Sequence, residues 1–599
     1  IKLFFIYFRC LTLCAMCDSG YVKMPNIVFI VADDLGWGDV SYHGSNQIMT
    51  PNIDMLAYQG TILSQYYTDV QGTPSRSALF TGKYPMRLGT QGKSIAAAED
   101  RGVPPSEPLL PSHLQDMGYS THLVGKWNIG KSREHYLPTN RGFDTFYGFL
   151  DGSVDYYTYN CVENWNDTVF YGLDFFENLS PVEDQRGHLT NVLTDRAIEL
   201  IRTHNTSGPL YLHMSHAAPH VGGGYVNLQT PEETIAVNDH IAHSARRLYA
   251  GLVAGLDKSV GNIIDALAER DILQDTIIIF VSDNGAASTG AARNFGSNLP
   301  LRGTKGTPWE GAVRAPAIIW HASLAPKIWR GLFHVTDWLP TLINAAGGNF
   351  NDTIDGVNQW PAIADNEEPT RTDALIAIDD LENWAAFREG DFKIIVGDLN
   401  EQTSGYFGNE LKTYRLPVFS YASVLLNSET ANIFKETLNL HLDIEKAIKK
   451  RNESNISTDV NKVENGEFCV PTRAKGCLFN ISADPTEAND LWYSFPEIVR
   501  HMTLRLRVYW TQLNPRQPPK LDQRANPALN NFIWFPWLDN DDKRPEALQT
   551  APSFPLQVSA GELQYFVDLN LSSFKDNLIK YIDSMADALV KSVTGIFSM

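Results

Sequence analysis

Four side chains with hard oxygen atoms end two apolar, β-branched runs of the chain, NIVFIVA and TIIIFVS. Asp33 and Asp34 follow the first run, and Asp283 and Asn284 follow the second. Carboxylate and amide oxygens suit Ca²⁺ or Mg²⁺ better than Zn²⁺. Acids after a strand also cap the next helix, so either pair alone is weak support for a metal. Two such pairs on two runs predict a site for a divalent cation.

The elements that must position these groups follow an alternating pattern. Asn26–Ala32 and Thr276–Ser282 are typical of buried parallel strands, and Pro209–Met214 is a third candidate strand followed by polar residues. Helical patterns lie between them, at Ser75–Thr81, Leu109–Met117, Leu189–Arg202 and Ala245–Leu267. This alternation predicts an α/β sheet whose ligand site lies beyond the carboxyl ends of its strands.

Longer motifs carry a specific resemblance. They are VADDLGWGDV (31–40), TPSRSALFTGKYPMRLG (73–89), GKWNIG (125–130), LPTNRGFDTFYGFLDGSVDYY (137–157), VSDNG (281–285), LRGTKGTPWEGAVR (301–314), DWLPTL (337–342) and, more weakly, LFNISADPTEANDL (478–491). In these motifs the chain resembles the sulfatase family, and most of all its arylsulfatase B (N-acetylgalactosamine-4-sulfatase) type. The resemblance implies the alkaline-phosphatase-like α/β fold, with a large mixed sheet between helices and a smaller C-terminal α+β domain.

The resemblance also implies a role for each matching residue. The matches are Asp33, Asp34, Asp283 and Asn284 for Ca²⁺, Lys126 and Lys305 for the sulfate oxygens, Arg76 for support of the nucleophile loop, and His220 for protonation of the leaving oxygen. Lysines supply point charges where negative charge develops. His216, in the same SHAAPH segment, is the nearby alternative to His220.

Two positions depart from the family pattern. Gly72 stands where the family has the cysteine that is oxidised to formylglycine, the nucleophile, although Thr73–Arg76 (TPSR) is intact. Asn128 stands where the family has the histidine of GKWHxG, which takes a proton from the aldehyde hydrate. Glycine has no side-chain carbon to oxidise, and an amide does not titrate near neutral pH. The two changes remove the attacking atom and the base that regenerates it.

Three hypotheses follow from these departures. The first is a catalytically inactive family member that keeps its cation site and binds a sulfated glycan or another sulfate ester. The second is an active arylsulfatase in which position 72 is really formylglycine. The third is a phosphatase or phosphodiesterase on the related alkaline-phosphatase scaffold with Thr73 as nucleophile. A shift of one residue at a helix start turns a side chain by about 100°, which disfavours the third hypothesis.

Composition excludes some classes of function. The chain has 599 residues and a formal net charge of -20, from 69 acidic and 49 basic side chains. Such a balance argues against a nucleic-acid-binding protein, which needs a basic face. An acidic chain also repels sulfated polymers at long range, so a sulfated ligand must meet a local basic pocket. After the leader no apolar stretch reaches the about 18 residues that a membrane span needs.

Several features predict a secreted or lysosomal destination. Residues 1–20 read as a signal peptide, which is incomplete if the true start precedes Ile1. Without this leader the cysteines are Cys161, Cys469 and Cys477, and the last two are close enough in sequence for a local disulfide. The glycosylation acceptors predicted from X-Ser/Thr motifs are Asn166, Asn205, Asn351, Asn452, Asn455, Asn480 and Asn570, while Pro181 weakens the motif at Asn178. Together they indicate an oxidising, extracytoplasmic compartment.

Changes in the sequence pattern along the chain predict the domain boundaries. The α/β domain is expected over 24–365 and a C-terminal subdomain over 366–545, with a polar, glycosylated insert at 400–466. The expected elements of the subdomain are strands at Ala374–Ile378, Trp384–Arg388, Phe392–Gly397 and Leu478–Ser482 and a helix at Pro496–Leu513. Residues 546–599 form an extra tail with an apolar stripe at helical spacing. That stripe is most typical of a helix packed on its own globule, and a helix that binds a protein partner or a membrane surface is the alternative.

Overall fold

The computed structural model describes residues 23–165, 168–415, 420–456 and 468–538. Several sequence-based predictions lie outside these residues: the signal peptide, the acceptors Asn166 and Asn570, part of the insert, and the amphipathic tail at 546–599. In the described part of the chain, none of the helices is both long and apolar enough to cross a bilayer.

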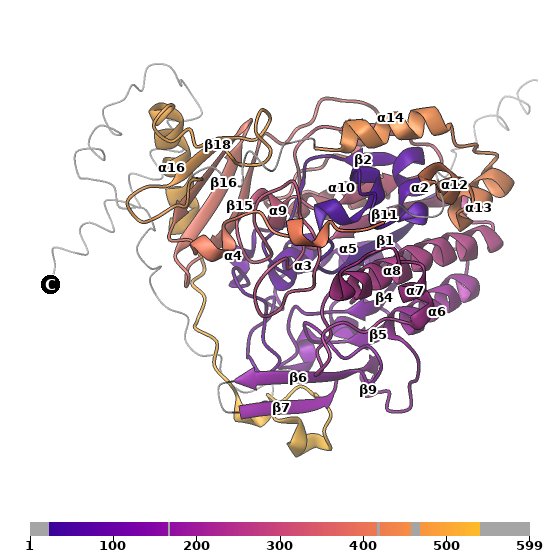
Figure 1. Ribbon diagram of the computed structural model, residues 1–599. Helices are drawn as coiled ribbons and strands as arrows, with labels where there is room; N and C mark the ends of the chain where they lie inside the picture. Colours follow the sequence, from indigo (N-terminus) through magenta and orange to yellow (C-terminus); the bar gives the residue numbers. More distant parts are fainter. Residues whose placement is uncertain (1–22, 166–167, 416–419, 457–467, 539–599) are drawn as a thin grey trace, which may run out of the picture. The chain divides into compact units, whose positions relative to one another are not determined.

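A ten-stranded mixed sheet forms the centre of the α/β domain (Figure 1). Its strands, in spatial order, are β13 (Lys327–Trp329), β2 (Thr61–Leu63), β12 (Ala317–Trp320), β11 (Thr276–Ser282), β1 (Asn26–Ala32), β10 (Leu210–Ser215), β4 (Ser120–Lys126), β5 (Thr145–Phe149), β8 (Phe176–Glu177) and β9 (Ser180–Pro181). The neighbours from β11 to β5 are parallel, and β12 and β8 pair antiparallel at either side of them. The sheet and the expected bounds of β1 and β11 are confirmed.

Both faces of the sheet are covered, as the uninterrupted apolar sequence of β1 requires. Val28 and Ile30 pack into one core with helices α2 (Pro51–Gln59), α6 (Leu189–Thr203) and α8 (Ser244–Glu269). Phe29, on the opposite face, packs edge-on against Trp338 at a centroid distance of 5.1 Å. Helices α3 (Gly72–Thr81), α5 (Leu110–Asp116) and α10 (Trp338–Ala345) line that second core. The arrangement is therefore a sheet between two helical layers.

A smaller antiparallel sheet follows the α/β domain. Its order is β15 (Asp373–Asp379), β16 (Trp384–Glu389), β17 (Phe392–Gly397) and β18 (Cys477–Asn480). Helix α16 (Pro496–Thr511) packs against β16 and β17. These are the strands and the helix that the sequence predicts for the C-terminal subdomain.

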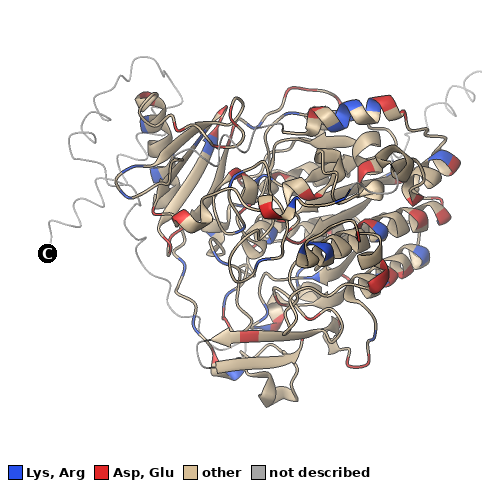
Figure 2. Ribbon diagram, viewed as in Figure 1, with Lys and Arg blue, Asp and Glu red and all other residues tan. Residues whose placement is uncertain are grey.

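The insert differs from its predicted place as a polar part of that subdomain. Its described residues form helices α12 (Tyr421–Leu426), α13 (Glu429–Leu438) and α14 (Ile444–Ser454). They contact α2 and α8 of the α/β domain, and Phe434 stacks on Trp320 at 4.8 Å. Charged side chains of both signs follow one another along α14 (Figure 2). The physical reason is burial, because the apolar face of α13 covers a part of the main core.

Candidate functional site

The predicted metal ligands come together where β1 and β11 end. Ala32 and Ser282 face each other in the parallel register, so the next two residues of each strand lie side by side. The backbone N–H of Asp34 donates to Asp283 Oδ1 at 3.3 Å, and Asn284 Nδ2 donates to Asp34 Oδ1 at 2.6 Å. The structure thus gathers the four side chains that the sequence singles out.

Three oxygens of this group have no hydrogen-bond partner. They are Asp33 Oδ1, Asp34 Oδ2 and Asn284 Oδ1, all on fully buried residues. A buried acceptor without a partner is costly, and a charged one costs more. Oxygen donors of this kind match the coordination preferences of a divalent cation. The residues present therefore fit the metal that the sequence predicts.

Two lysines complete the charge balance of the site. Lys126, at the end of β4, lies with its Nζ 2.6 Å from Asp33 Oδ2, and Lys305 Nζ lies 2.7 Å from Asp34 Oδ1. Burial would raise the pKa of Asp33, but Lys126 and His220 hold it below its ordinary value. Burial lowers the pKa of Lys305 less than Asp34 and Asp33 raise it, so the net pKa is high. Burial lowers the pKa of Lys126, and the neighbouring Asp33 acts in the opposite direction.

Arg76 joins helix α3 to the metal ligands. Its guanidinium donates to Asp283 Oδ2 at 2.9 and 3.1 Å, and it also donates to the Ser215 hydroxyl at the end of β10. Helix α3 begins at Gly72, three residues before the expected start at Ser75. The early start is physically reasonable, since Pro74 suits the first turn of a helix. Position 72 is consequently the first helical residue.

A side chain at position 72 would point into the centre of the site. An ideal Cβ built on Gly72 lies 3.2 Å from Asp283 Oδ2, 3.4 Å from Lys126 Nζ and 3.6 Å from Asn128 Oδ1. The backbone of Gly72 is not in the left-handed region, so nothing in its conformation demands glycine. A side chain at position 72 would therefore contact Asp283, Lys126 and Asn128, and glycine supplies none.

Asn128, the second departure, contacts the residue after Gly72. The Thr73 hydroxyl is 2.8 Å from the carbonyl oxygen of Asn128 and 3.0 Å from its Oδ1. The same hydroxyl accepts from the N–H of Ile95 at 3.0 Å. Asn128 has a φ of 56°, a left-handed conformation that asparagine adopts more readily than most residues. Its side chain therefore lies beside position 72, where the expected base would lie.

Of the two candidate histidines, His220 belongs to the site. Its Nε2 lies 3.6 Å from Asp34 Oδ2, and its pKa is lowered, first by burial and then by Lys305. His216 is fully buried, and its Nε2 lies 3.0 Å from the hydroxyl of Ser259 on α8. The structure thus favours the assignment of the predicted role to His220.

Three supporting residues escape sequence reasoning. Ser215 accepts from Arg76, the Tyr156 hydroxyl donates to the carbonyl oxygen of His220 at 2.9 Å, and Asn294 Nδ2 donates to the carbonyl oxygen of Asp34 at 3.0 Å. Each holds the backbone or the guanidinium of a predicted site residue. Only their places in the resembling motifs could have drawn attention to Ser215 and Tyr156, because a serine or a tyrosine alone carries no metal or acid–base signature.

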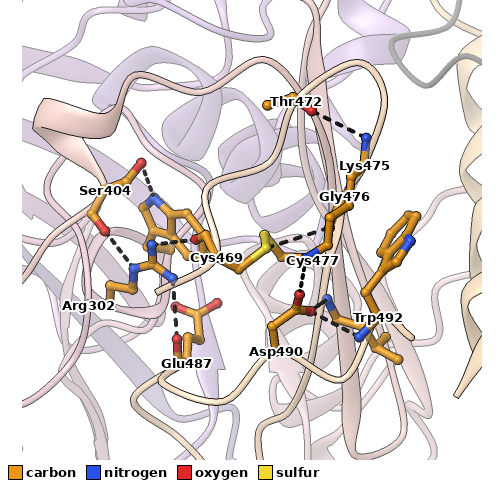
Figure 3. The surroundings of a disulfide bond; sticks show 12 residues. Arg302, Ser404, Cys469, Thr472, Lys475, Gly476, Cys477, Glu487, Asp490 and Trp492 are labelled. Carbon is orange, nitrogen blue, oxygen red and sulfur yellow. Dashed lines mark hydrogen bonds and ion pairs between the residues drawn. A yellow bond between two sulfur atoms is a disulfide. The ribbon is translucent and has the colours of Figure 1, made fainter. Parts of the chain in front are cut away.

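The loop that carries Lys305 is anchored by the C-terminal subdomain. The Arg302 guanidinium stacks on Trp309 at 3.5 Å and donates to the carbonyl oxygens of Ser404, Cys469 and Glu487 at 2.6, 2.7 and 3.3 Å. Cys469 is disulfide-bonded to Cys477, the first residue of β18 (Figure 3). The disulfide therefore fixes one of the acceptors that hold the Lys305 loop in place.

Comparison with known proteins decides the family. The family model that describes sulfatases matches residues 25–348, a range that contains the predicted site residues from Asp33 to Lys305. The chain belongs to the sulfatase family. The match of the sheet and of the smaller C-terminal sheet domain to solved sulfatases confirms the predicted alkaline-phosphatase-like fold.

Individual sulfatases are similar over most of the chain. Mouse arylsulfatase J is 35% identical over 530 residues, which cover 87% of this chain and 82% of the relative. Rat N-acetylgalactosamine-6-sulfatase is 31% identical over 58% of this chain and 67% of its own length. The crystal structure of Ps i-CgsB in complex with k-i-k-neocarrahexaose has a TM-score of 0.63 and 25% identity, and covers 85% of this chain and 98% of that one.

Proposed function

We propose that this sulfatase-family protein, of the arylsulfatase B-like type, does not turn over sulfate esters but keeps a cation site that binds them. The proposal rests mainly on one observation: a side chain at position 72 would point into the site, but glycine has none. The Cβ of any other residue there would lie within 3.6 Å of Asp283, Lys126 and Asn128. These three residues surround a position that holds no nucleophile.

The second departure supports the same conclusion. Asn128 occupies the place beside Gly72 where a titratable base would regenerate the nucleophile. An amide oxygen accepts a hydrogen bond but does not take up a proton near neutral pH. Residues of one catalytic unit act non-additively, so once the first is lost the loss of the second costs little more. Two changes in one unit are what relaxed selection on turnover would leave.

The charged side chains of the site favour binding of a cation and, through it, of a sulfate group. Three carboxylates, Asp33, Asp34 and Asp283, are paired with three cationic side chains, Lys126, Lys305 and Arg76. A divalent cation held by the unpartnered oxygens adds two positive charges to this balanced group. Ca²⁺ is the cation expected from the family, with Mg²⁺ as the alternative. The bound cation would supply the charge that attracts a sulfate group, and the lysines would orient its oxygens.

The class of ligand follows from the relatives. Rat N-acetylgalactosamine-6-sulfatase is named for a sulfated sugar, and Ps i-CgsB was crystallised with a carrageenan oligosaccharide. We therefore infer that the ligand of this chain is a sulfated glycan or a smaller sulfate ester. A nucleic acid does not fit a chain with a net charge of -20. A protein partner bound through the tail at 546–599 remains a proposal on residues that the structure does not describe.

An extracytoplasmic location fits the described residues. The Cys469–Cys477 disulfide suits an oxidising compartment, and the predicted acceptors Asn205, Asn351 and Asn455 are exposed. We propose a secreted or lysosomal glycoprotein with a signal peptide at 1–20. We keep the proposed units 24–365, 366–545 and 546–599, although the described helices of the insert pack on the first of them.

The direct test measures turnover and binding on one preparation of the full chain. We expect no hydrolysis of a chromogenic aryl sulfate above the background of an unrelated purified protein. We expect N-acetylgalactosamine 4-sulfate to bind in calorimetry while unsulfated N-acetylgalactosamine does not. A Lys126→Ala variant is the matched control, because it removes a predicted sulfate contact. Turnover by the wild-type chain would falsify the loss of catalysis.

One observation favours an alternative, an active arylsulfatase. The residues that follow position 72, Thr73–Arg76, are intact, and Arg76 is hydrogen-bonded in the site. If residue 72 is formylglycine in the native protein, its aldehyde would lie beside Lys126 and Asp283. The phosphatase hypothesis is weaker, because the Thr73 hydroxyl is held by Asn128 and Ile95. Mass analysis of residue 72 separates the first two hypotheses.

A further inference from the structure

A surface groove lies where the α/β domain meets the chain that follows α16. Its volume is about 520 Å³, which falls within the range of small-molecule sites. The lining comprises residues 88–89, 99–102 and 514–524, with Arg133 and Leu538, and includes none of the predicted site residues. We call it the 514–524 groove. It is a second concave surface, separate from the cation site.

Basic side chains outnumber acidic ones in the 514–524 groove. Each of its three acids pairs with an arginine of the same lining at 2.8–3.4 Å: Glu99 with Arg101, Asp100 with Arg133, and Asp522 with Arg524. Two further cations, Arg516 and Lys520, have no acid of the lining to balance them. On a chain with a net charge of -20, such a local positive excess favours an anionic ligand.

Arg516 has a buried donor to spare. The residue is 3% exposed, and one terminal nitrogen of its guanidinium donates to Asp379 Oδ1 at 3.1 Å. Its Nε has no hydrogen-bond partner. Burial lowers the pKa of the neighbouring Arg101, and Arg516 lowers it further against the opposing effect of Glu99. A buried N–H without an acceptor is costly, so an oxyanion in the groove would supply what Arg516 lacks.

Lys520 presents a free charge at the rim of the groove. It is exposed, and within the described part of the chain it makes no ion pair or hydrogen bond. Pro518 and Pro519 precede it directly. Proline fixes φ near -65°, so this segment holds the lysine in place at a low cost in conformational entropy. The ammonium group is therefore available to a ligand.

One segment of the chain joins the groove to the predicted site. The N–H of Thr73, the residue after Gly72, donates to Ser94 Oγ at 3.2 Å. The Arg101 guanidinium donates to the carbonyl oxygen of Lys93, the residue before Ser94, at 2.8 Å. Consecutive residues thus contact the first turn of α3 and the lining of the groove. A ligand with several sugar units can extend from one to the other.

We propose that the 514–524 groove binds a second sulfate group of the same glycan, so that the protein takes a multiply sulfated oligosaccharide rather than a single sulfated sugar. The inference rests on the proposed function, which supplies the first sulfate contact at the cation site. Guanidinium and ammonium groups are the donors that sulfate oxygens require. Two linked contacts raise the affinity, because the second one forms within the same molecule.

The test compares a short ligand with a long one on the purified full chain. A chondroitin 4-sulfate hexasaccharide and N-acetylgalactosamine 4-sulfate are titrated by calorimetry into the wild type and Lys520→Glu. We expect the variant to weaken the hexasaccharide at least about threefold, as for one exposed charge pair, and to leave the monosaccharide within about twofold. The matched control is Lys449→Glu, an equal charge change at an exposed position of α14 outside the groove. It should weaken neither ligand.

A labelling measurement needs no variant. The bound hexasaccharide should protect Lys520 of the wild type from an amine-reactive reagent and leave Lys449 reactive, as read by mass analysis of peptides. Equal reactivity of Lys520 with and without the hexasaccharide overturns the proposal. Equal losses of both ligands in Lys520→Glu, or no binding of the hexasaccharide, also overturn it. Hydrolysis of an aryl sulfate, or a hexasaccharide that binds through Lys520 while the monosaccharide fails to bind, would instead overturn the proposed function and leave the groove standing.

Discussion

The Thr73 hydroxyl shares its proton between two oxygens of Asn128, the carbonyl oxygen at 2.8 Å and Oδ1 at 3.0 Å. This contact ties the first turn of α3 to the strand-end loop after β4. It holds the Asn128 side chain beside Gly72, 3.6 Å from where a Cβ would lie. Gly72 and Asn128, the two positions expected to depart from the family pattern, therefore lie side by side in one structural unit.

We predict that Gly72→Cys combined with Asn128→His restores turnover. The double variant completes the motif whose cysteine the sulfatase-modifying machinery of the host cell oxidises, and the remaining site residues are in place. A Cβ at position 72 needs shifts of only a few tenths of an ångström beside Asp283. Hydrolysis of a chromogenic aryl sulfate is measured after expression in cells with that machinery.

The control for this experiment is Gly72→Ala with Asn128→His, which adds the Cβ without an oxidisable group. It should fold with a free energy of unfolding within about 1 kcal/mol of the wild type, because glycine-to-alanine changes at compatible sites are small. The control should show no turnover. Formylglycine detected at position 72 of the first variant without any hydrolysis would mean that further parts of the site have been lost.

We predict that sulfate binding depends on the cation. The carboxylates and the cationic side chains of the site balance one another, so the divalent ion provides the excess positive charge. Removing the ion with a chelator should weaken N-acetylgalactosamine 4-sulfate at least about tenfold, a typical coupling between two sites. Calorimetry with Ca²⁺, with Mg²⁺ and with chelator measures this affinity. Equal affinity in all three would contradict the shared site.

We predict that Arg302 positions the Lys305 loop. Arg302→Lys keeps the charge but cannot reach the three carbonyl oxygens that the guanidinium bonds. Leaving buried carbonyls without donors costs about 1–3 kcal/mol each, so the free energy of unfolding should fall by about 3 kcal/mol. The matched control is Arg473→Lys, whose exposed pair with Asp398 should matter by less than about 1 kcal/mol. Similar losses in both variants would argue against a positioning role.

We predict a pH dependence that traces to Asp69. Burial raises the pKa of this carboxyl to about 8, so the folded state holds a proton that the unfolded state releases above its ordinary value of 3.8. Stability is therefore greatest at low pH and is lost as the pH rises towards 8. Between pH 6.5 and 8 this one group should cost about 1–2 kcal/mol.

Thermal or chemical unfolding of Asp69→Asn between pH 6.5 and 8 checks this prediction. The variant should lose that part of the slope, because an amide does not titrate. Burial also raises the pKa of Asp174 to about 8 and the pKa values of Asp257 and Glu487 to about 7, so these groups share the window and the variant should lose only the part of the slope that belongs to Asp69. Asp365→Asn, at an exposed position, should keep the wild-type slope. A slope unchanged in Asp69→Asn would show that other groups cause it.

The sequence predicted the strands better than the contacts between distant loops. The β-branched runs of β1 and β11 end in acids, and their bounds are as expected. Helix α3 begins three residues before the start that the sequence predicts, because Gly72, Thr73 and Pro74 are residue types common in turns. The helices of the insert were missed, since a polar stretch gives little sign that Phe434 will be buried on Trp320.

Side-chain networks were the least predictable part of the site. Each candidate metal ligand is predicted from its residue type and from its place after a strand, which are local properties. The bonds from Arg302 to the carbonyl oxygens of Ser404, Cys469 and Glu487 join segments far apart in the sequence. Any arginine can make such bonds, so only the folded arrangement shows which one does.

The most direct measurement of the central claim is the mass of the peptide that contains residue 72, from protein isolated from its natural source. A proteolytic fragment spanning 69–76 is sequenced by fragmentation. The account predicts a residue 72 with the mass of glycine. A residue heavier by one carbon and one oxygen atom, as in formylglycine, would contradict it and indicate an active sulfatase.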